Sequence, residues 1–263
     1  IGKMCITRIA SFTNQQINSV IVKKDENDYL FVYYLLRTKI EEIKSIAGGA
    51  ATPIVNKTTF SNVIAKLPPL TTQRKIAGVL SAYDDLIENN TRRIAILEEM
   101  AKRIYKEWFV DFKYPSHEND TMVDSELGMI PEGGEVKKLG DVLELAYGKG
   151  LKKEKRKDGD IPVYGSGGII GFHNEFLVNG HGIIVGRKGN VGSVYWSSVN
   201  FFQIDTVFYV VSDLSMYYLF YNLKNQNFIN TDAAVPGLSR NLAYLNEILI
   251  PEKTTIEKFE PHI

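Results

Sequence analysis

The sequence predicts an α+β protein, in which globular domains of mixed helix and strand are joined by long helices. Three observations lead to this prediction. Residues 71–112 have the apolar spacing of one long helix, residues 146–200 are glycine-rich and strand-like, and residues 189–258 repeat residues 2–75.

The first 70 residues are expected to fold as part of a domain with both strands and helices. A helix is predicted over Tyr29–Ile46, and the glycine pair at 48–49 ends it. The prolines at 68–69 cannot continue a strand and lead into the next helix. Strands are predicted, from β-branched and apolar residues, over Met4–Ile9, Ile17–Lys23 and Val63–Leu67.

The long helix predicted over 71–112 carries a narrow apolar seam. At spacings of four and three, nine of ten positions are apolar or aromatic, and Asn90 is the polar one. A heptad seam requires a partner helix alongside, and a polar seam residue typically fixes the register. At about 1.5 Å per residue the helix would span roughly 55–60 Å, so we expect it to act as a spacer. The ten positions are Ile76, Leu80, Tyr83, Ile87, Asn90, Ile94, Leu97, Ala101, Ile104 and Trp108.

A connector rich in proline and glycine, 113–134, separates this helix from a second domain over 135–251. The second domain is predicted to alternate strands with glycine-containing turns and to contain one clear helix. The strands are expected over Ile161–Gly168, His181–Gly186, Val191–Trp196, Phe201–Val211 and Ile248–Pro251, and the helix over Ser215–Asn225.

The two domains are related by an internal repeat. Ile17-Asn18-Ser19-Val20 matches Ile204-Asp205-Thr206-Val207 at a shift of 187 positions. After a four-residue deletion, Ala50-Ala51-Thr52-Pro53 matches Ala233-Ala234-Val235-Pro236, and Thr71-Thr72 matches Thr254-Thr255, at a shift of 183. Residues 252–263 would then begin a second long helix, the natural antiparallel partner of the first. By the same comparison, 1–70 is the C-terminal part of the first domain.

Composition limits the classes of function. The formal net charge is zero, so a nucleic-acid surface must be a local patch. The single cysteine, Cys5, excludes an intramolecular disulfide framework and suits a reducing compartment, so we expect a cytoplasmic protein. The longest apolar runs are too short to span a bilayer.

Several short segments carry a family resemblance. They read LPPLTTQRKIA at 67–77, LSAYDDLIENN at 80–90, WFVDF at 108–112, KLGDV at 138–142 and PGLSRN at 236–241. With these segments the chain resembles the specificity subunit of type I restriction–modification systems, over nearly its whole length.

The resemblance implies a function and a set of partners. Each globular part would be a target recognition domain that reads one half of a bipartite double-stranded DNA sequence. The paired helices would set the gap and dock two methyltransferase (modification) subunits, and restriction or translocase subunits are further implied partners. The chain itself would be non-catalytic, within a complex that acts as a DNA adenine methyltransferase or type I restriction endonuclease. S-adenosylmethionine, ATP and Mg are expected only in the partner subunits.

Candidate DNA contacts follow from residue chemistry. Lys and Arg suit phosphates, and Arg and Asn also suit base edges. The candidates are Lys149, Lys152, Lys153, Lys155, Arg156 and Lys157 in a basic run, Arg187, Lys188 and Asn190 in a glycine-containing turn, and Ser239, Arg240 and Asn241 in a repeated loop. The alternatives are a solvated loop for the run, a simple hairpin for the turn, and packing against the helix base for the loop.

Candidate partner contacts lie on the long helix. They are Tyr83, Asp84, Asn90, Trp108 and Phe109, although Trp108 and Phe109 have packing against the second domain as their alternative. The four histidines lack paired metal-ligand spacing, and no phosphate-loop motif occurs, so no catalytic or metal site is predicted. The competing hypothesis for the whole chain is a coiled-coil protein-interaction scaffold without DNA specificity.

Overall fold

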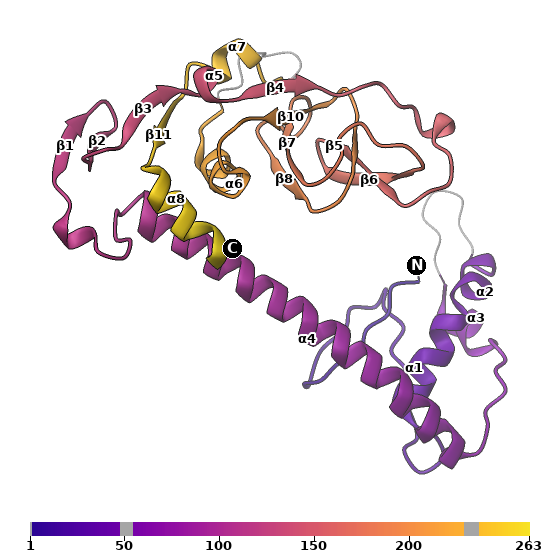
Figure 1. Cartoon of the computed structure of the whole chain (residues 1–263). Helices are drawn as coiled ribbons and strands as arrows, with labels where there is room; N and C mark the ends of the chain where they lie inside the picture. The colour runs from indigo at the N-terminus through magenta and orange to yellow at the C-terminus, as the bar shows by residue number, and fades with distance from the viewer. Residues whose placement is uncertain (1, 48–54, 229–236) are drawn as a thin grey trace. The chain divides into compact units, whose positions relative to one another are not determined.

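The computed structural model describes residues 2–47, 55–228 and 237–263. These residues form two compact units, Ile1–Ile96 (unit 1) and Leu97–Ile263 (unit 2). Both contain helices, and unit 2 also contains antiparallel sheets, which confirms the predicted α+β class (Figure 1). The predicted glycine stop at 48–49 and the match of 50–53 with 233–236 lie outside the described residues.

The predicted long helix is present as α4 (Leu70–Phe109), a single helix of 40 residues that contributes to both units. It ends three residues earlier than predicted. Val110 and Asp111 still donate their backbone N–H groups to the carbonyl of Lys106, but Phe112 adopts a left-handed φ of 55°. That backbone conformation cannot continue a right-handed helix.

Unit 1 is mainly helical, with α1 (Tyr29–Thr38), α2 (Ile40–Ser45) and α3 (Lys57–Ser61). The helix predicted over 29–46 is interrupted at Lys39, which caps α1 and precedes α2. At the start of α1, the Asp28 side chain accepts a hydrogen bond from the backbone N–H of Phe31 at 2.9 Å. This bond satisfies one of the free donors at the helix N-terminus.

The three strands predicted in unit 1 are wrong: none of them forms among the described residues. Shifted by 187 or 183 positions, they fall on or beside the unit 2 strands β8 (Val194–Ser197), β10 (Val207–Val211) and β11 (Glu247–Ile250). Those strands pair with β7 (Gly182–Gly186), β4 (Glu144–Tyr147) and β3 (Glu135–Lys138). All three pairing strands precede Gly189, where the repeat begins, so the repeated segment does not include them. A strand without a pairing neighbour has no ladder to stabilise it.

Gln73 connects the start of α4 to the N-terminus of α1. It is 1% exposed, and its side-chain oxygen accepts a hydrogen bond from the N–H of Asp28 at 3.0 Å. Its amide nitrogen donates to the Asn27 side chain at 3.1 Å and to the carbonyl of Pro68 at 2.8 Å. A single side chain thus joins the segment before α1 to the segment before α4.

Gln73→Ala should destabilise unit 1 by about 1–3 kcal/mol, because it leaves a partly buried backbone donor and acceptor unpaired. Urea unfolding, followed by hydrogen exchange of the α1 amides, measures the loss. Gln15→Ala is the matched control, since Gln15 is exposed. Equal protection of α1 in the two variants would contradict the assigned role of Gln73.

Unit 2 contains a four-stranded antiparallel sheet in the order β4-β10-β7-β8. A second sheet has the order β6-β5-β9, in which β6 (Gly168–His173) is antiparallel and β9 (Phe202–Gln203) is parallel to β5 (Ile161–Gly165). Strands β3 and β11 form a separate antiparallel pair. The predicted connector is more ordered than expected, since it holds a hairpin of β1 (Met122–Ser125) and β2 (Gly128–Pro131).

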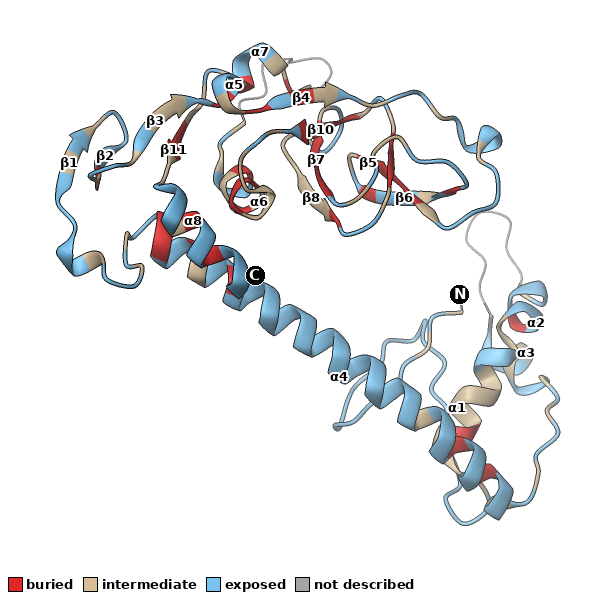
Figure 2. Ribbon diagram, viewed as in Figure 1, coloured by how far each residue is buried: buried red, intermediate tan, exposed pale blue. Residues whose placement is uncertain are grey.

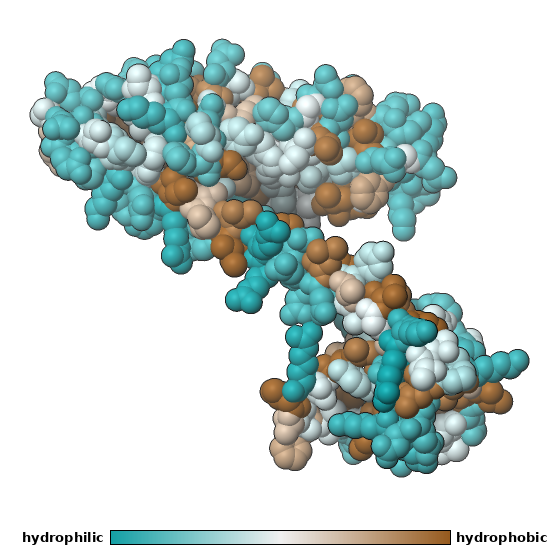
Figure 3. Space-filling view, turned by 60° about the horizontal axis from the view of Figure 1, so that its bottom comes forward, coloured by the Kyte–Doolittle hydropathy of each residue, from teal (hydrophilic) through white to brown (hydrophobic). Residues whose placement is uncertain are grey.

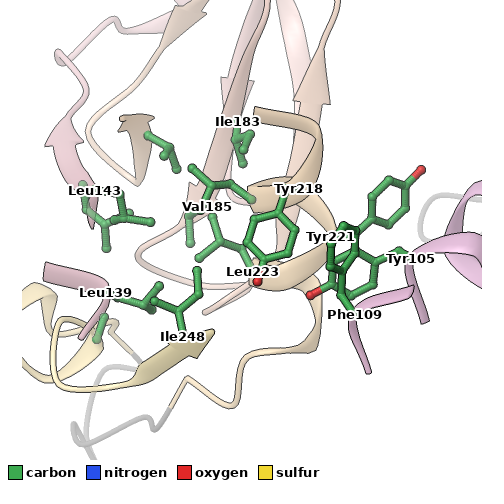
Figure 4. Close-up of a cluster of buried hydrophobic side chains, with 14 of the residues drawn as sticks. Tyr105, Phe109, Leu139, Leu143, Ile183, Val185, Tyr218, Tyr221, Leu223 and Ile248 are labelled. Carbon is green, nitrogen blue, oxygen red and sulfur yellow. The ribbon is translucent and has the colours of Figure 1, made fainter. Parts of the chain in front are cut away.

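Helices pack together with the four-stranded sheet in the core of unit 2. They are α5 (Leu139–Val142), α6 (Met216–Asn225), α7 (Arg240–Ala243), α8 (Lys253–Phe259) and the C-terminal end of α4. Figure 4 shows Tyr105 and Phe109 of α4 meeting Tyr218 and Tyr221 of α6. The ring of Phe109 lies 4.9 Å from those of both Tyr218 and Phe259.

The internal repeat predicted from the sequence is visible in the helices. Helix α1 coincides with α6 at the shift of 187, with the same first and last positions. At the shift of 183, α3 begins where α7 begins, and α4 begins where α8 begins. Figure 1 shows α8 running beside the end of α4 in the opposite direction, as expected for an antiparallel partner.

Candidate nucleic-acid interface

The candidate DNA-binding residues of unit 2 gather at one edge of the four-stranded sheet. Strand β4 ends at Tyr147 and β7 ends at Gly186, while β10 begins between them at Val207. Val207 pairs with Gly186, and Phe208 pairs with Tyr147. The segments that follow β4 and β7 therefore leave the sheet side by side, and they carry Lys149, Arg187 and Lys188.

The turn after β7 is held by backbone hydrogen bonds. The N–H groups of Arg187 and Lys188 both donate to the carbonyl of Thr206, at 3.0 and 3.1 Å. Gly189 and Gly192 adopt φ values of 80° and 72°, a region that favours glycine. The side chains of Lys188 and Asn190 are exposed on this turn.

Two neighbouring turns pack against this one. Ser166, in the β5–β6 turn, accepts hydrogen bonds at its carbonyl from the hydroxyls of Ser193 and Tyr195, at 3.0 and 3.1 Å. After β4, a Cβ on Gly148 would lie 2.1 Å from the carbonyl oxygen of Ile204, so only glycine fits there. The adjacent N–H of Lys149 donates to the carbonyl of Gln203. Four chain segments thus form one continuous edge.

Arg187 and Arg240 meet at the ring of Tyr147. Their guanidinium carbons lie 4.9 and 5.0 Å from the ring centroid, within the range of cation–π attraction. The backbone brings the two arginines together, because the N–H of Leu238 donates to the carbonyl of Arg187 at 2.7 Å. The predicted turn and the predicted repeated loop therefore contribute to the same place.

The basic run after Lys149 is divided in its roles. Lys152, Lys153 and Lys155 are exposed, and among the described residues none of them forms an ion pair. Arg156 instead donates to the carbonyl of Ile170 at 2.8 Å, and Lys157 lies 3.9 Å from the carboxylate of Glu175. Arg156 therefore uses one of its donors on strand β6, and it is less exposed than the three lysines.

The repeated loop has a matching local structure in both units. Ser239 precedes α7 as its N-cap residue, and Asn56 occupies the corresponding position before α3. Asn56 accepts a hydrogen bond from the N–H of Thr59, whereas the side chain of Ser239 makes no capping bond. Asn241 is exposed beside Arg240, so this loop adds one amide and one guanidinium to the edge.

The candidate partner residues on α4 fall into two groups. Tyr83, Asp84 and Asn90 are exposed, and the carboxylate of Asp84 accepts a hydrogen bond from the hydroxyl of Tyr34 at 2.7 Å. Desolvation and this hydrogen bond raise the pKa of Tyr34 to about 12. The first group therefore remains available to a partner.

Trp108 and Phe109 form the second group, and here the structure does not support the predicted partner contact. Their side chains are 8% and 6% exposed, because they pack into the core of unit 2 against Phe259. The alternative, packing against the second domain, describes them. The sequence does not decide between a partner contact and core packing here, because an aromatic pair at a helix end has the same pattern in both cases.

The heptad seam of α4 is exposed over most of its length. Every residue from 82 to 100 is exposed, and the ribbon in Figure 2 is pale blue there. Figure 3 shows hydrophobic side chains along this helix. Tyr83, Ile87, Ile94 and Leu97 are 57–64% exposed. Isolated exposed apolar residues are ordinary, but a continuous row at heptad spacing indicates a partner helix.

Tyr147 is the residue of this edge that the sequence candidates omitted. It is 50% exposed, and its ring rests edge-on against the buried Phe208 at 5.1 Å. The sequence signal was an aromatic residue directly before the Gly-Lys-Gly turn. Its role depends on Arg187 and Arg240, which lie 40 and 93 positions further along the chain, so spacing alone could not reveal it.

The described part of the chain contains neither a membrane-spanning helix nor a cluster of metal-ligating side chains. No helix in the described part of the chain is long and apolar enough to cross a membrane. Among residues 2–47, 55–228 and 237–263, no group of three or more His, Cys, Asp or Glu side chains has the arrangement of a metal site.

Comparisons with known proteins agree on one family. A family model described as the type I restriction modification DNA specificity domain matches residues 1–99 and 131–251. The type I restriction enzyme MjaIX specificity subunit of Methanocaldococcus jannaschii is 37% identical over 150 residues, which are 56% of this chain and 34% of the relative. The MjaVIII specificity subunit of the same organism is 30% identical over 193 residues, or 72% of this chain and 40% of the relative.

A solved structure has the same fold. The crystal structure of a type I restriction–modification system S subunit from M. genitalium matches with a TM-score of 0.57 at 20% identity. The match covers 90% of this chain and 65% of that one. At this identity the likeness concerns the fold alone. The chain spans well under half the length of the curated relatives that it matches.

Proposed function

Because the chain belongs to the family of type I restriction–modification DNA specificity proteins, we propose that it selects the DNA sequence on which a type I complex acts. Unit 2 is the part that binds duplex DNA, reading one half of a bipartite target. Unit 1 belongs to the domain that reads the other half. The helix α4 sets the gap between the two half-sites.

The observation that carries this proposal is the convergence of unpaired cations at one edge of unit 2. Lys149, Arg187, Lys188 and Arg240 come from three chain segments, and none forms an ion pair among the described residues. Net charge cannot explain the clustering, because the chain as a whole is neutral. A local basic edge that also presents Asn190 and Asn241 offers both phosphate and base contacts.

The exposed seam of α4 supports a second part of the proposal. An antiparallel helix alongside the seam would complete this pair, as α8 does at the end of α4, where Phe259 packs against Tyr105 and Phe109. Two methyltransferase subunits would dock on this helical pair, with Tyr83, Asp84 and Asn90 among the contacts. Restriction or translocase subunits would join through them. A cytoplasmic location follows from these partners.

In this proposal the chemistry belongs to the partners. The chain is a non-catalytic subunit of a DNA adenine methyltransferase or type I restriction endonuclease. The partner subunits hold S-adenosylmethionine, ATP and Mg. A protein-interaction scaffold without DNA specificity remains the competing function, and the two differ in whether the chain confers salt-dependent DNA binding.

Lys149→Ala combined with Lys188→Ala should weaken duplex binding by the complex of this chain with a methyltransferase subunit. Each lost phosphate contact reduces the slope of log K against log salt by about one, so the double variant should lose about two. Binding at several salt concentrations measures both affinity and slope.

Lys137→Ala with Lys253→Ala is the matched control, since it removes the same charge from β3 and α8. An unchanged slope in the first double variant would remove Lys149 and Lys188 from the interface. Salt-independent behaviour of the unsubstituted complex would favour the scaffold.

A further inference from the structure

Tyr147, Arg187 and Arg240 form a compact group, here called the Tyr147 cluster. The buried ring of Phe208 packs edge-on against the ring of Tyr147. The guanidinium carbon of Arg187 lies 4.9 Å from the Tyr147 ring centroid and 5.7 Å from that of Phe208. Arg240 approaches Tyr147 at 5.0 Å and Tyr244 at 5.9 Å. Each guanidinium is thus held by two aromatic rings.

The cluster concentrates positive charge without neutralising it. Neither arginine forms an ion pair with a carboxylate among the described residues. Arg187 donates to the backbone carbonyl of Asp205 at 3.1 Å, which uses one donor of five and cancels no charge. The Nε of Arg240 is buried and has no hydrogen-bond partner in the described structure. Two cations close to one ring, neither paired with a carboxylate among the described residues, favour an anion bound at the exposed part of the cluster.

The geometry favours a phosphate over a base edge as that anion. A guanine edge is read by one guanidinium that presents two parallel donors. Here two guanidiniums lie 4.9 and 5.0 Å from the centroid of the same ring, and each is restrained by contacts with two aromatic rings. A phosphate diester, which carries a full charge and several acceptor oxygens, can accept from both at once. The exposed Lys188 and Asn190 on the adjacent turn remain free for other contacts.

We propose that Arg187 and Arg240 together hold one backbone phosphate of the bound duplex, and that Tyr147 is the positioning residue that orients both guanidiniums. This inference rests on the proposed function, because it assigns one contact within that interface. The cluster fixes the register of unit 2 on the duplex and does not distinguish one base pair from another.

Neutral methylphosphonate substitution tests the contact directly. A duplex carrying the preferred sequence is prepared with one phosphate at a time made neutral, and binding by the complex with a methyltransferase subunit is measured. At one position the unsubstituted chain should lose about tenfold to a hundredfold in affinity. Arg187→Ala and Arg240→Ala should each weaken binding to the unmodified duplex and become much less sensitive to that same position. Each should keep the same ratio of specific to non-specific affinity.

Tyr147 variants separate positioning from folding. Tyr147→Phe keeps the ring and should retain the sensitivity, whereas Tyr147→Leu should reduce it although no charge is lost. Lys137→Ala is the control and should behave as the unsubstituted chain. Thermal melting of each variant checks that unit 2 is folded.

Three outcomes would overturn the inference while leaving the proposed function intact, provided the unsubstituted complex binds DNA. The arginine variants could keep full sensitivity at every phosphate. They could instead relax the preference at one base pair, which would make them base readers. Inorganic phosphate, titrated at constant ionic strength, could compete with the duplex through these two arginines, which would assign the site to the free ion. Absence of DNA binding by the unsubstituted complex would instead count against the proposed function.

Discussion

Phe109→Ala should lower the free energy of unfolding of unit 2 by about 3–5 kcal/mol, the usual range for removing a buried aromatic side chain. Phe109 is 6% exposed and its ring contacts those of Tyr105, Tyr218 and Phe259. The substitution therefore opens a cavity where α4, α6 and α8 meet. Urea unfolding followed by tyrosine fluorescence measures the change.

Tyr83→Ala provides the matched control on the same helix. Tyr83 is 64% exposed, so its loss should change stability by less than about 0.5 kcal/mol. If Phe109→Ala were as mild as Tyr83→Ala, the end of α4 would not belong to the core of unit 2. The role of Phe109 as a partner contact would then have to be reconsidered.

Lengthening α4 by one heptad should change the DNA gap that the assembled complex recognises. Duplicating Ile87–Arg93 preserves the seam and adds about 10 Å of helix, because each residue contributes about 1.5 Å. That distance corresponds to about three base pairs at roughly 3.4 Å each. Selection of bound sequences from a randomised pool measures the gap before and after the insertion.

The control for this insertion adds seven residues elsewhere. The turn between β1 and β2, at Glu126 and Leu127, lies outside the helix and should accept the extra chain without altering the gap. A gap that stays constant when α4 is lengthened would refute the spacer role. A gap that changes with the turn insertion would place the spacing determinant in the connector.

The helices and the repeat could be predicted because the residue pattern itself shows them: heptad spacing marks the long helix, and matching segments mark the repeat. The heptad spacing located α4 within three residues at its C-terminal end, and the repeat anticipated that α1 and α6 would coincide. The strand predictions in unit 1 were wrong because strand formation also depends on a second segment elsewhere in the chain. Ile17–Lys23 has the same composition as a true strand, but a strand forms only when a second segment pairs with it.

The sequence predicts the charged residues of the candidate interface but not how they are arranged around Tyr147. Arg187 and Arg240 were chosen because of their residue type and their turns. Their meeting at Tyr147 depends on the register of β10 between β4 and β7, which no local pattern encodes. Arg156 shows the converse, since one of its donors is bonded to the carbonyl of Ile170, a contact that its place in a basic run does not reveal. Exposure likewise separates Tyr83 from Trp108, although both occupy the seam.

The central claim is that this chain selects a bipartite DNA sequence for a methyltransferase complex. The most direct test is to mix the chain with its candidate methyltransferase subunit and a randomised duplex pool, and to sequence the DNA that a complex of defined mass retains. A bipartite motif with a fixed gap is expected, in a complex that contains two methyltransferase subunits. A pool that shows no enrichment at any salt concentration would contradict it and would favour the protein-interaction scaffold.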